Sequence, residues 1–286
     1  ALKENALMSW QHWQHEYAGL LKTRATDERG RRLARDFRVE MRQVVLPELG
    51  SVDRCVSCHN GLDDPRMKDQ AMPHATHPGA YLQWHEINRF GCTSCHRGQG
   101  RAMDFADAKA EDRHWDYPLL PREMTQSSCG VCHSVHEVAE RGGEVYATGA
   151  RLFEAKGCRG CHKVGMRGGS LGPDLSNEGL KVRGQLPMAG MRGPHTLPQW
   201  LLEHFDNPQA VVAGSRMPQP GLARSEATAL ATYLLSLQKR DLPSSYLSPE
   251  KHLEIYTRAH PDSSSGEQLF AAYCSPCHDT GRIGRY

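Results

Sequence analysis

Five copies of one short pattern, Cys-x-x-Cys-His, account for every cysteine in the chain. They are Cys55/Cys58/His59, Cys92/Cys95/His96, Cys129/Cys132/His133, Cys158/Cys161/His162 and Cys274/Cys277/His278. Two thiols three positions apart can each add to one vinyl group on the same edge of a haem, and the histidine that follows is then placed under the iron as its proximal ligand. The pattern therefore predicts five covalently attached haems c.

Other uses of paired cysteines explain the pattern less well. Structural zinc sites do not need a histidine directly after each pair, and five pairs would leave one without a partner. A disulfide framework or a redox dithiol gives no reason for the five histidines. We therefore expect no zinc. The formal charge is only +2, with 35 basic and 33 acidic residues scattered along the chain, so we also expect no nucleic-acid partner.

The composition is thin in apolar side chains for a chain of 286 residues. Hydrophobic residues make up 38% and aromatic residues 7%, so side chains alone would give a small core. The first cysteines of the first three motifs are 37 residues apart, which is too little chain to enclose each haem separately. We expect a mainly α protein with much irregular structure, in which residues 51–142 form a trihaem module packed around its own haems.

The N-terminal segment, residues 1–50, reads as helical. Apolar residues recur at helical spacing from Trp10 to Leu21, and the stretch to about Arg42 is rich in helix formers. This predicts an amphipathic helix that ends before Pro47. Residues 66–78 carry prolines among methionines and histidines, which predicts irregular structure.

Residues 143–240 contain a second ordered set of motifs. The set comprises Gly149-Ala-Arg-Leu-Phe153 before the fourth Cys-x-x-Cys-His, Gly172-Pro173-Asp174-Leu175 and Ser215-Arg216-Met217-Pro218 after it, and the apolar-periodic stretch 226–237. This order resembles a class I monohaem cytochrome c domain over nearly its full length. The resemblance implies a known fold and a single haem held by one proximal histidine.

The same resemblance implies particular roles for residues of this domain. Gly149 and Phe153 of the first helix would pack on Tyr233 of the last, and Pro173 would orient the proximal His162. Met217, in a short loop, would be the sixth ligand of the iron. Met188 and Met191 remain competitors for that role.

The C-terminal part repeats the opening of this domain. After a Pro- and Ser-bearing linker, residues 241–265, the sequence Gly266-Glu-Gln-Leu-Phe270 precedes the fifth motif, so residues 266–286 read as the start of a second cytochrome c domain. The given sequence ends eight residues after His278, before a methionine loop or last helix. We expect the chain to continue beyond Tyr286, or the fifth haem to be completed by another segment or another chain.

The N-terminal motifs carry a second resemblance, over about residues 38–140. The stretches Val52-Asp53-Arg54-Cys55 through Asp63-Asp64-Pro65, His77-Pro78, Phe90-Gly91-Cys92-Thr93 through Gly100, and His114-Trp115-Asp116-Tyr117-Pro118 resemble multihaem cytochromes associated with bacterial quinol-oxidising respiratory complexes. The resemblance implies distal iron ligands at His77, His85 and His114. His85 departs from the family pattern because Glu86 follows it, where the family has proline. His74, His136, His12 and His15 are alternatives.

These features together predict an electron-transfer protein without independent catalysis. It would carry single electrons through five haems from a membrane quinol-oxidising complex to a downstream acceptor. Because a methionine ligand raises the reduction potential of a c-type haem, electrons would enter at the first three haems and leave through the others. The attachment chemistry implies a periplasmic or extracytoplasmic location, and the start at Ala1 suggests a processed N-terminus.

Two other functions stay open at this point. One is a multihaem redox enzyme in which one haem keeps an open coordination position, such as a nitrite reductase or a peroxidase. Pentahaem nitrite reductases usually replace one motif histidine by lysine, whereas all five motifs here end in histidine. The other is a subunit of a cytochrome filament, in which the incomplete fifth haem would take its ligand from a neighbouring subunit.

Overall fold

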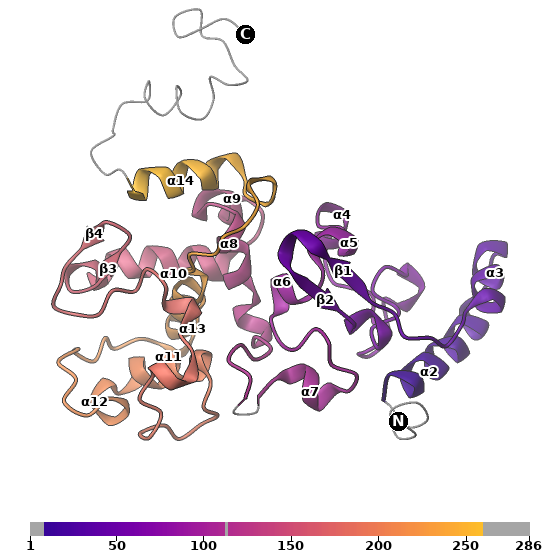
Figure 1. Cartoon of the computed structure of the whole chain (residues 1–286), viewed down its shortest axis with the longest axis horizontal. Coiled ribbons are helices and arrows are strands. Elements are labelled where there is room, and N and C mark those ends of the chain that lie inside the picture. The colour runs from indigo at the N-terminus through magenta and orange to yellow at the C-terminus, as the bar shows by residue number, and fades with distance from the viewer. Residues whose placement is uncertain (1–8, 112–113, 260–286) are drawn as a thin grey trace, which may run out of the picture. The chain divides into compact units, whose positions relative to one another are not determined.

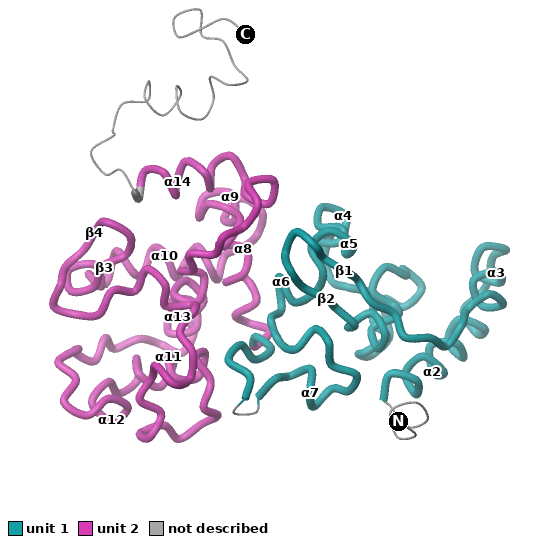
Figure 2. Tube along the Cα trace, in the orientation of Figure 1, with its two compact units in different colours: residues 1–120 teal, residues 121–286 magenta. Residues whose placement is uncertain are grey.

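The computed structural model describes residues 9–111 and 114–259. The chain divides into two compact units, residues 1–120 and residues 121–286 (Figure 2). Helices predominate in both, with two short antiparallel hairpins, and long connections have no regular structure. The predicted mainly α class with much irregular structure is confirmed. In the described ranges, no helix is both long enough and apolar enough to cross a membrane.

Unit 1 begins with two helices where the sequence predicts one. Helix α2 spans Ser9–Arg24 and helix α3 spans Glu28–Asp36. The break lies at Asp27, whose extended backbone and side chain cap α3 by accepting a hydrogen bond from Gly30 N at 2.6 Å. The prediction of one helix to about Arg42 is therefore wrong, because a local capping residue restarts the helix and residues 37–43 lack helical structure.

Helix α2 is fastened to the first motif by polar side chains. Gln14 is fully buried, and its Nε2 donates to the carbonyls of Glu40 and Ser57 at 2.8 and 2.9 Å. One turn later, Tyr17 donates to Asp64 at 3.1 Å. Tyr17 also packs with Leu21 and Met67 in the small apolar core of this unit. The helix thus fixes the chain both within and after the first motif.

The rest of unit 1 consists of short elements around the first two motifs. Strands β1 and β2 form a hairpin in which Val44 faces Asp53 and Leu46 faces Ser51. Residues 68–80 hold only turns and bends, as predicted. The elements are β1 Val44–Leu46, β2 Ser51–Asp53, α4 Tyr81–Trp84, α5 Ile87–Phe90, α6 Thr93–His96 and α7 Phe105–Lys109, with 3-10 turns at Pro47–Leu49, Cys55–Ser57 and Pro65–Met67.

Unit 2 is built on the packing of α10 against α13 (Figure 1). Tyr146 and Phe153 of α10 are nearly fully buried, and their rings lie 6.1 and 5.4 Å from that of Tyr233 on α13. The elements are α8 Cys129–Cys132, α9 Val135–Glu140, α10 Glu144–Ala155, β3 Lys163–Val164, β4 Arg167–Gly168, α11 Leu197–Asp206, α12 Pro208–Val211, α13 Arg224–Ser236 and α14 Pro249–Ala259, with 3-10 turns at Arg122–Ser128, Cys158–Gly160, Glu178–Leu180, Arg183–Gln185 and Ser244–Tyr246.

Gly149 permits the close approach of these two helices. A Cβ at this position would overlap the carbonyl oxygen of Ala229 and would contact Tyr233 Cβ at 2.8 Å. Glycine in a helix interior normally costs stability, so its presence here reflects the contact rather than helix formation. The packing of Gly149 and Phe153 on Tyr233 is the one that the cytochrome c resemblance implies.

The third motif lies in unit 2, so residues 51–142 of the predicted trihaem module span the boundary at residue 120. Helix α8 carries its two cysteines, and a Cβ at Gly130 would contact the Tyr146 ring on α10 at 2.5 Å. Within the predicted linker 241–265, residues 249–259 form α14. The Ser248 N–H before α14 donates to the Cys132 carbonyl at 2.9 Å, so this segment packs directly on the third motif.

We expect Gly149→Ala to destabilise unit 2 by about 1–3 kcal/mol, because the added methyl group must displace the α13 backbone. The change would otherwise favour helix formation by up to about 1 kcal/mol. Chemical denaturation followed by far-UV circular dichroism measures the difference. Gly184→Ala is the matched control, since a Cβ there meets nothing within 4 Å. Equal stability of Gly149→Ala and the parent would contradict this packing argument.

Candidate functional site

The four described Cys-x-x-Cys-His motifs share one local conformation. In each, the backbone N–H of the histidine donates to the carbonyl of the first cysteine, at 2.9 Å in all four cases: His59 to Cys55, His96 to Cys92, His133 to Cys129 and His162 to Cys158. This closes a single helical turn, and residues at i, i+3 and i+4 lie on one face of such a turn. Both thiols and the imidazole of each motif therefore start from the same face.

The second cysteine of the motif is held in the same turn. The backbone N–H of Cys95 donates to the Cys92 carbonyl at 3.1 Å, and that of Cys161 donates to the Cys158 carbonyl at 3.2 Å. The described cysteines are all half-buried and form no disulfides: Cys55, Cys58, Cys92, Cys95, Cys129, Cys132, Cys158 and Cys161. Cys95 and Cys161 are thus held in the turn outside any disulfide. Their attachment to haem, like that of the other cysteines, stays a prediction.

The imidazoles of the first two motifs have the chemical state that iron ligation requires. Burial is the main influence that lowers the pKa of His59 and of His96, so both imidazoles stay neutral. Nδ1 of His59 is buried without a hydrogen-bond partner. Free thiols next to buried neutral imidazoles fit a haem bound through two thioethers and one axial nitrogen.

The first and second motifs are in direct contact. The Cys55 and Cys92 side chains are neighbours, and each affects the other: Cys92 lowers the pKa of Cys55, and Cys55 raises that of Cys92. His59 and His96 are also close enough for the charge of His59 to lower the pKa of His96, although burial is the larger effect. Two haems attached here would have adjacent thioether edges.

His77 lies opposite the second proximal histidine. The ring centroids of His77 and His96 are 6.2 Å apart, with 69° between the ring planes. Two imidazoles that bind one metal from opposite sides have centroids about 6 Å apart, given metal–nitrogen bonds of about 2 Å. Nδ1 of His77 lies 2.9 Å from the Pro78 carbonyl, which fits a tautomer that leaves Nε2 free for a metal. The distal role of His77 stays a prediction, and the spacing of the two rings is compatible with it.

The other predicted distal ligands have different surroundings. The Nδ1 of His85 lies 3.2 Å from the Tyr81 carbonyl, and its ring is 5.0 Å from that of Phe90. His114 is exposed and belongs to unit 1. Met217 is half-buried, and Gln209 donates to its carbonyl at 2.8 Å. Their roles as ligands stay predictions. The fifth motif, Cys274, Cys277 and His278, lies outside the described residues.

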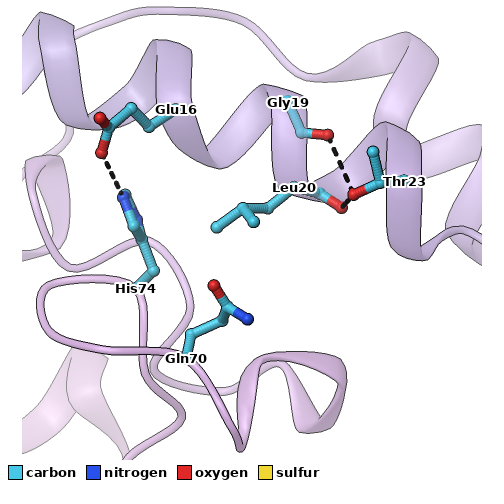
Figure 3. A pocket seen from close by; sticks show the side chains of 6 residues that line it. All are labelled: Glu16, Gly19, Leu20, Thr23, Gln70 and His74. Carbon is cyan, nitrogen blue, oxygen red and sulfur yellow. Dashed lines mark hydrogen bonds and ion pairs between the residues drawn. The ribbon is translucent and has the colours of Figure 1, made fainter.

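His74, an alternative in the sequence, lies beside the first motif. It is 7% exposed, and its Nε2 is 3.1 Å from Glu16 Oε2. The pKa of His59 is lowered mainly by burial and to a smaller extent by the charge of His74. Figure 3 shows the Glu16 carboxylate on α2 hydrogen-bonded to His74. Both residues line an open cavity of about 450 Å³, together with Leu20 and Gln70. The backbone carbonyl of Pro73 acts on His59 in the opposite sense and raises its pKa. The loop that carries Pro73 and His74 thus adjoins the proximal His59.

The third motif is supported by carboxylates from two helices. His133 Nδ1 lies 3.8 Å from Glu137, and Ser134 forms a capping box with Glu137 at the start of α9. Burial would raise the pKa of Glu137, but hydrogen bonds from Ser248 and Ser134 and the nearby His133 lower it overall. Ser134 also donates to Glu250 on α14 at 2.7 Å. An ionised carboxylate therefore faces the third proximal histidine.

The fourth motif has a proximal histidine held by the backbone. His162 Nδ1 lies 2.9 Å from the Pro173 carbonyl, as the cytochrome c resemblance implies. A Cβ at Gly172 would come within 2.5 Å of the His162 ring, so only glycine lets the chain pass this close. The contact with Pro173 orients the imidazole and leaves Nε2 for iron.

Two residues near these motifs, the half-buried His204 and the buried Asp53, were missed by the sequence reasoning. His204 stacks on Trp200 with centroids 4.5 Å apart, and burial together with His162 and Lys181 lowers its pKa to about 4. Asp53 is fully buried and contacts the second motif. This aspartate comes shortly before the first motif, but no pattern in the sequence shows which distant backbone it reaches.

Unit 2 contains a cytochrome c domain. Residues 146–238 match the Cytochrome c family, which places an electron-transfer haem domain in unit 2 and implies a haem c there. The chain is 29% identical to cytochrome c oxidase subunit 2 of Alkalihalophilus pseudofirmus over 126 residues, 43% of this chain and 34% of that protein. The chain thus spans about a third of the length of this relative. No solved structure matches the chain.

Proposed function

We propose that this protein is a multihaem c-type cytochrome that carries single electrons through five covalently bound haems. When bound, haem c supplies reversible one-electron transfer between ferric and ferrous iron. The observation that carries the proposal is the common turn of the four described motifs, which presents two cysteines outside any disulfide and one imidazole each time. The fifth motif has the same residue pattern.

Electron transfer between haems needs the haem edges to be close to each other. In unit 1, the attachment points of the first two motifs are neighbours. The Cys55 and Cys92 side chains are neighbours, which brings the attachment points of the first two motifs close together. In unit 2, the Cys129–Cys132 helix packs on α10, the helix that leads into the fourth motif. The polypeptide between motifs therefore acts as a spacer that keeps neighbouring attachment points near one another.

The ligands proposed for the irons suggest a direction of transfer. His77 with His96 would give the second haem two imidazoles, and His85 and His114 would serve other haems of the N-terminal group. Met217 would complete the fourth haem with His162. Since thioether ligation raises the reduction potential, electrons would pass from the N-terminal haems toward the cytochrome c domain and then to the fifth haem or an acceptor.

The proposed electron donor rests on a sequence resemblance, and the proposed cellular location rests on the chemistry of haem attachment. A membrane quinol-oxidising complex is the proposed donor, because the N-terminal motifs resemble cytochromes of such complexes. The match to a cytochrome c oxidase subunit 2 supports a place in respiratory electron transfer. Haem c attachment suggests the periplasmic or extracytoplasmic side of a bacterial membrane.

Intact-mass spectrometry and a pyridine haemochrome assay should give five haems per chain. A Cys129→Ala/Cys132→Ala variant should lose one haem, because the two thioethers of the third motif can no longer form. Cys158→Ala/Cys161→Ala is the matched comparison in the cytochrome c domain and should also lose one. A parent protein with fewer than five haems after full maturation, or with bound zinc, would refute the five-haem assignment.

His77→Ala should convert one haem from low-spin to high-spin iron, because the alanine leaves a single imidazole on that iron. Electron paramagnetic resonance of the oxidised protein and carbon monoxide binding to the reduced protein measure this change. His252→Ala is the control, since the His252 ring lies against the Ser244 carbonyl at 3.2 Å. Unchanged low-spin iron in His77→Ala would show that His77 is not a ligand.

A potentiometric titration should resolve a low-potential group of three haems and at least one haem of clearly higher potential. The high-potential haem should fall toward the low group in Met217→His, because a second imidazole replaces the thioether. Five haems that titrate together in the parent protein would contradict the proposed direction of electron transfer.

A further inference from the structure

Asp53 is a buried carboxylate that the proposed electron transfer does not yet use. It lies at the end of β2, directly before Arg54 and Cys55, and is 0% exposed. Its Oδ2 accepts hydrogen bonds from the backbone N–H groups of Cys92 and Thr93 at 2.5 and 2.9 Å. Its Oδ1 accepts one from Thr93 Oγ1 at 2.7 Å. A side chain beside the first motif thus holds the start of the second motif.

The surrounding backbone is shaped around this carboxylate. A Cβ at Gly91 would overlap Oδ2, and a Cβ at Gly100 would overlap Oδ1. Gly91 also has a φ of 64°, a conformation that favours glycine. The Gly100 carbonyl accepts from Arg54 N at 2.7 Å. The two glycines therefore let the backbone on either side of the second motif close over the carboxylate.

The charge on Asp53 is not neutralised by a cation. All three of its hydrogen-bond partners are donors, which suits an ionised carboxylate. Within the described part of the chain, no lysine, arginine or histidine forms an ion pair with it. Asp53 lies two positions before Cys55, and its Oδ2 is 2.5 Å from the backbone nitrogen of Cys92. Its charge is therefore close to both attachment points.

We propose that Asp53 is a positioning residue that joins the first two haem attachments into one rigid pair and holds the reduction potentials of both haems low. The inference rests on the proposed function, since it needs haems at the first two motifs. Its electrostatic basis is that reduction adds an electron near a fixed negative charge. In a buried site that repulsion is screened far less than at the surface.

Asp53→Asn tests the charge with little change in size. Two of the five midpoint potentials should rise, and the other three should stay where they are. Asp69→Asn is the matched control, because it removes the same charge in the same unit from a side chain that is 69% exposed. Its potentials should equal those of the parent, since solvent screens that charge.

Thr93→Val separates the charge from the packing. It removes the donor at 2.7 Å and keeps the carboxylate, so the negative charge is less compensated and the same two potentials should fall. A purely structural role for Asp53 predicts shifts of the same sign in Asp53→Asn and Thr93→Val. Opposite signs would support the proposal, and equal signs would overturn its electrostatic part. Thr93→Val is expected to lower two reduction potentials, so it tests the proposal even if Asp53→Asn fails to mature.

The haem count distinguishes failure of this inference from failure of the proposed function. Each variant is first assayed by intact mass and pyridine haemochrome. A parent protein without haems at the first two motifs refutes the proposed function. If the parent protein and Asp53→Asn both carry five haems and their potentials are the same, the role of Asp53 is refuted and the five-haem assignment is intact.

Discussion

The hydrogen bond from each motif histidine to the carbonyl of the first cysteine is the constraint on which the rest of the structure depends. It closes one helical turn around five residues and sends two thiols and an imidazole to the same face. The four described motifs share this turn although they sit in different elements: a 3-10 turn at Cys55 and at Cys158, and short α-helices at the other two. Every other part of the fold has to support these turns and keep their faces open.

The support is largely polar. Gln14 binds the carbonyl of Ser57 inside the first motif, and Asp53 holds the backbone of the second. The Ser248 N–H binds the Cys132 carbonyl, and the Pro173 carbonyl holds the fourth proximal histidine. Buried hydrogen bonds of this kind are directional, so they fix the orientation of each turn in a way that apolar contacts do not. This explains how a chain with few aromatic and aliphatic residues can keep its motifs in place.

Sequence patterns predicted the cytochrome c domain well because its determinants are local or of fixed spacing. The helix predicted at 226–237 is α13, Arg224–Ser236, and Gly149, Phe153 and Tyr233 meet as implied. The N-terminal segment was predicted less well. Helix-forming residues continue past Arg24, but the cap at Asp27 divides the segment into two helices. The segment after Asp241 reads as a linker by composition, yet α14 lies within it and the residue before α14 binds the third motif.

The sequence by itself determined which residues could attach haem, since the turn of the four described Cys-x-x-Cys-His motifs needs nothing beyond their own spacing. Only the tertiary structure decided which motifs are neighbours and which side chains act between them. The contacts between Cys55 and Cys92, between the rings of His77 and His96, and between Asp53 and Thr93 all join residues 19 to 40 positions apart. The physical reason is that such contacts depend on the path of irregular chain, which has no periodicity to read.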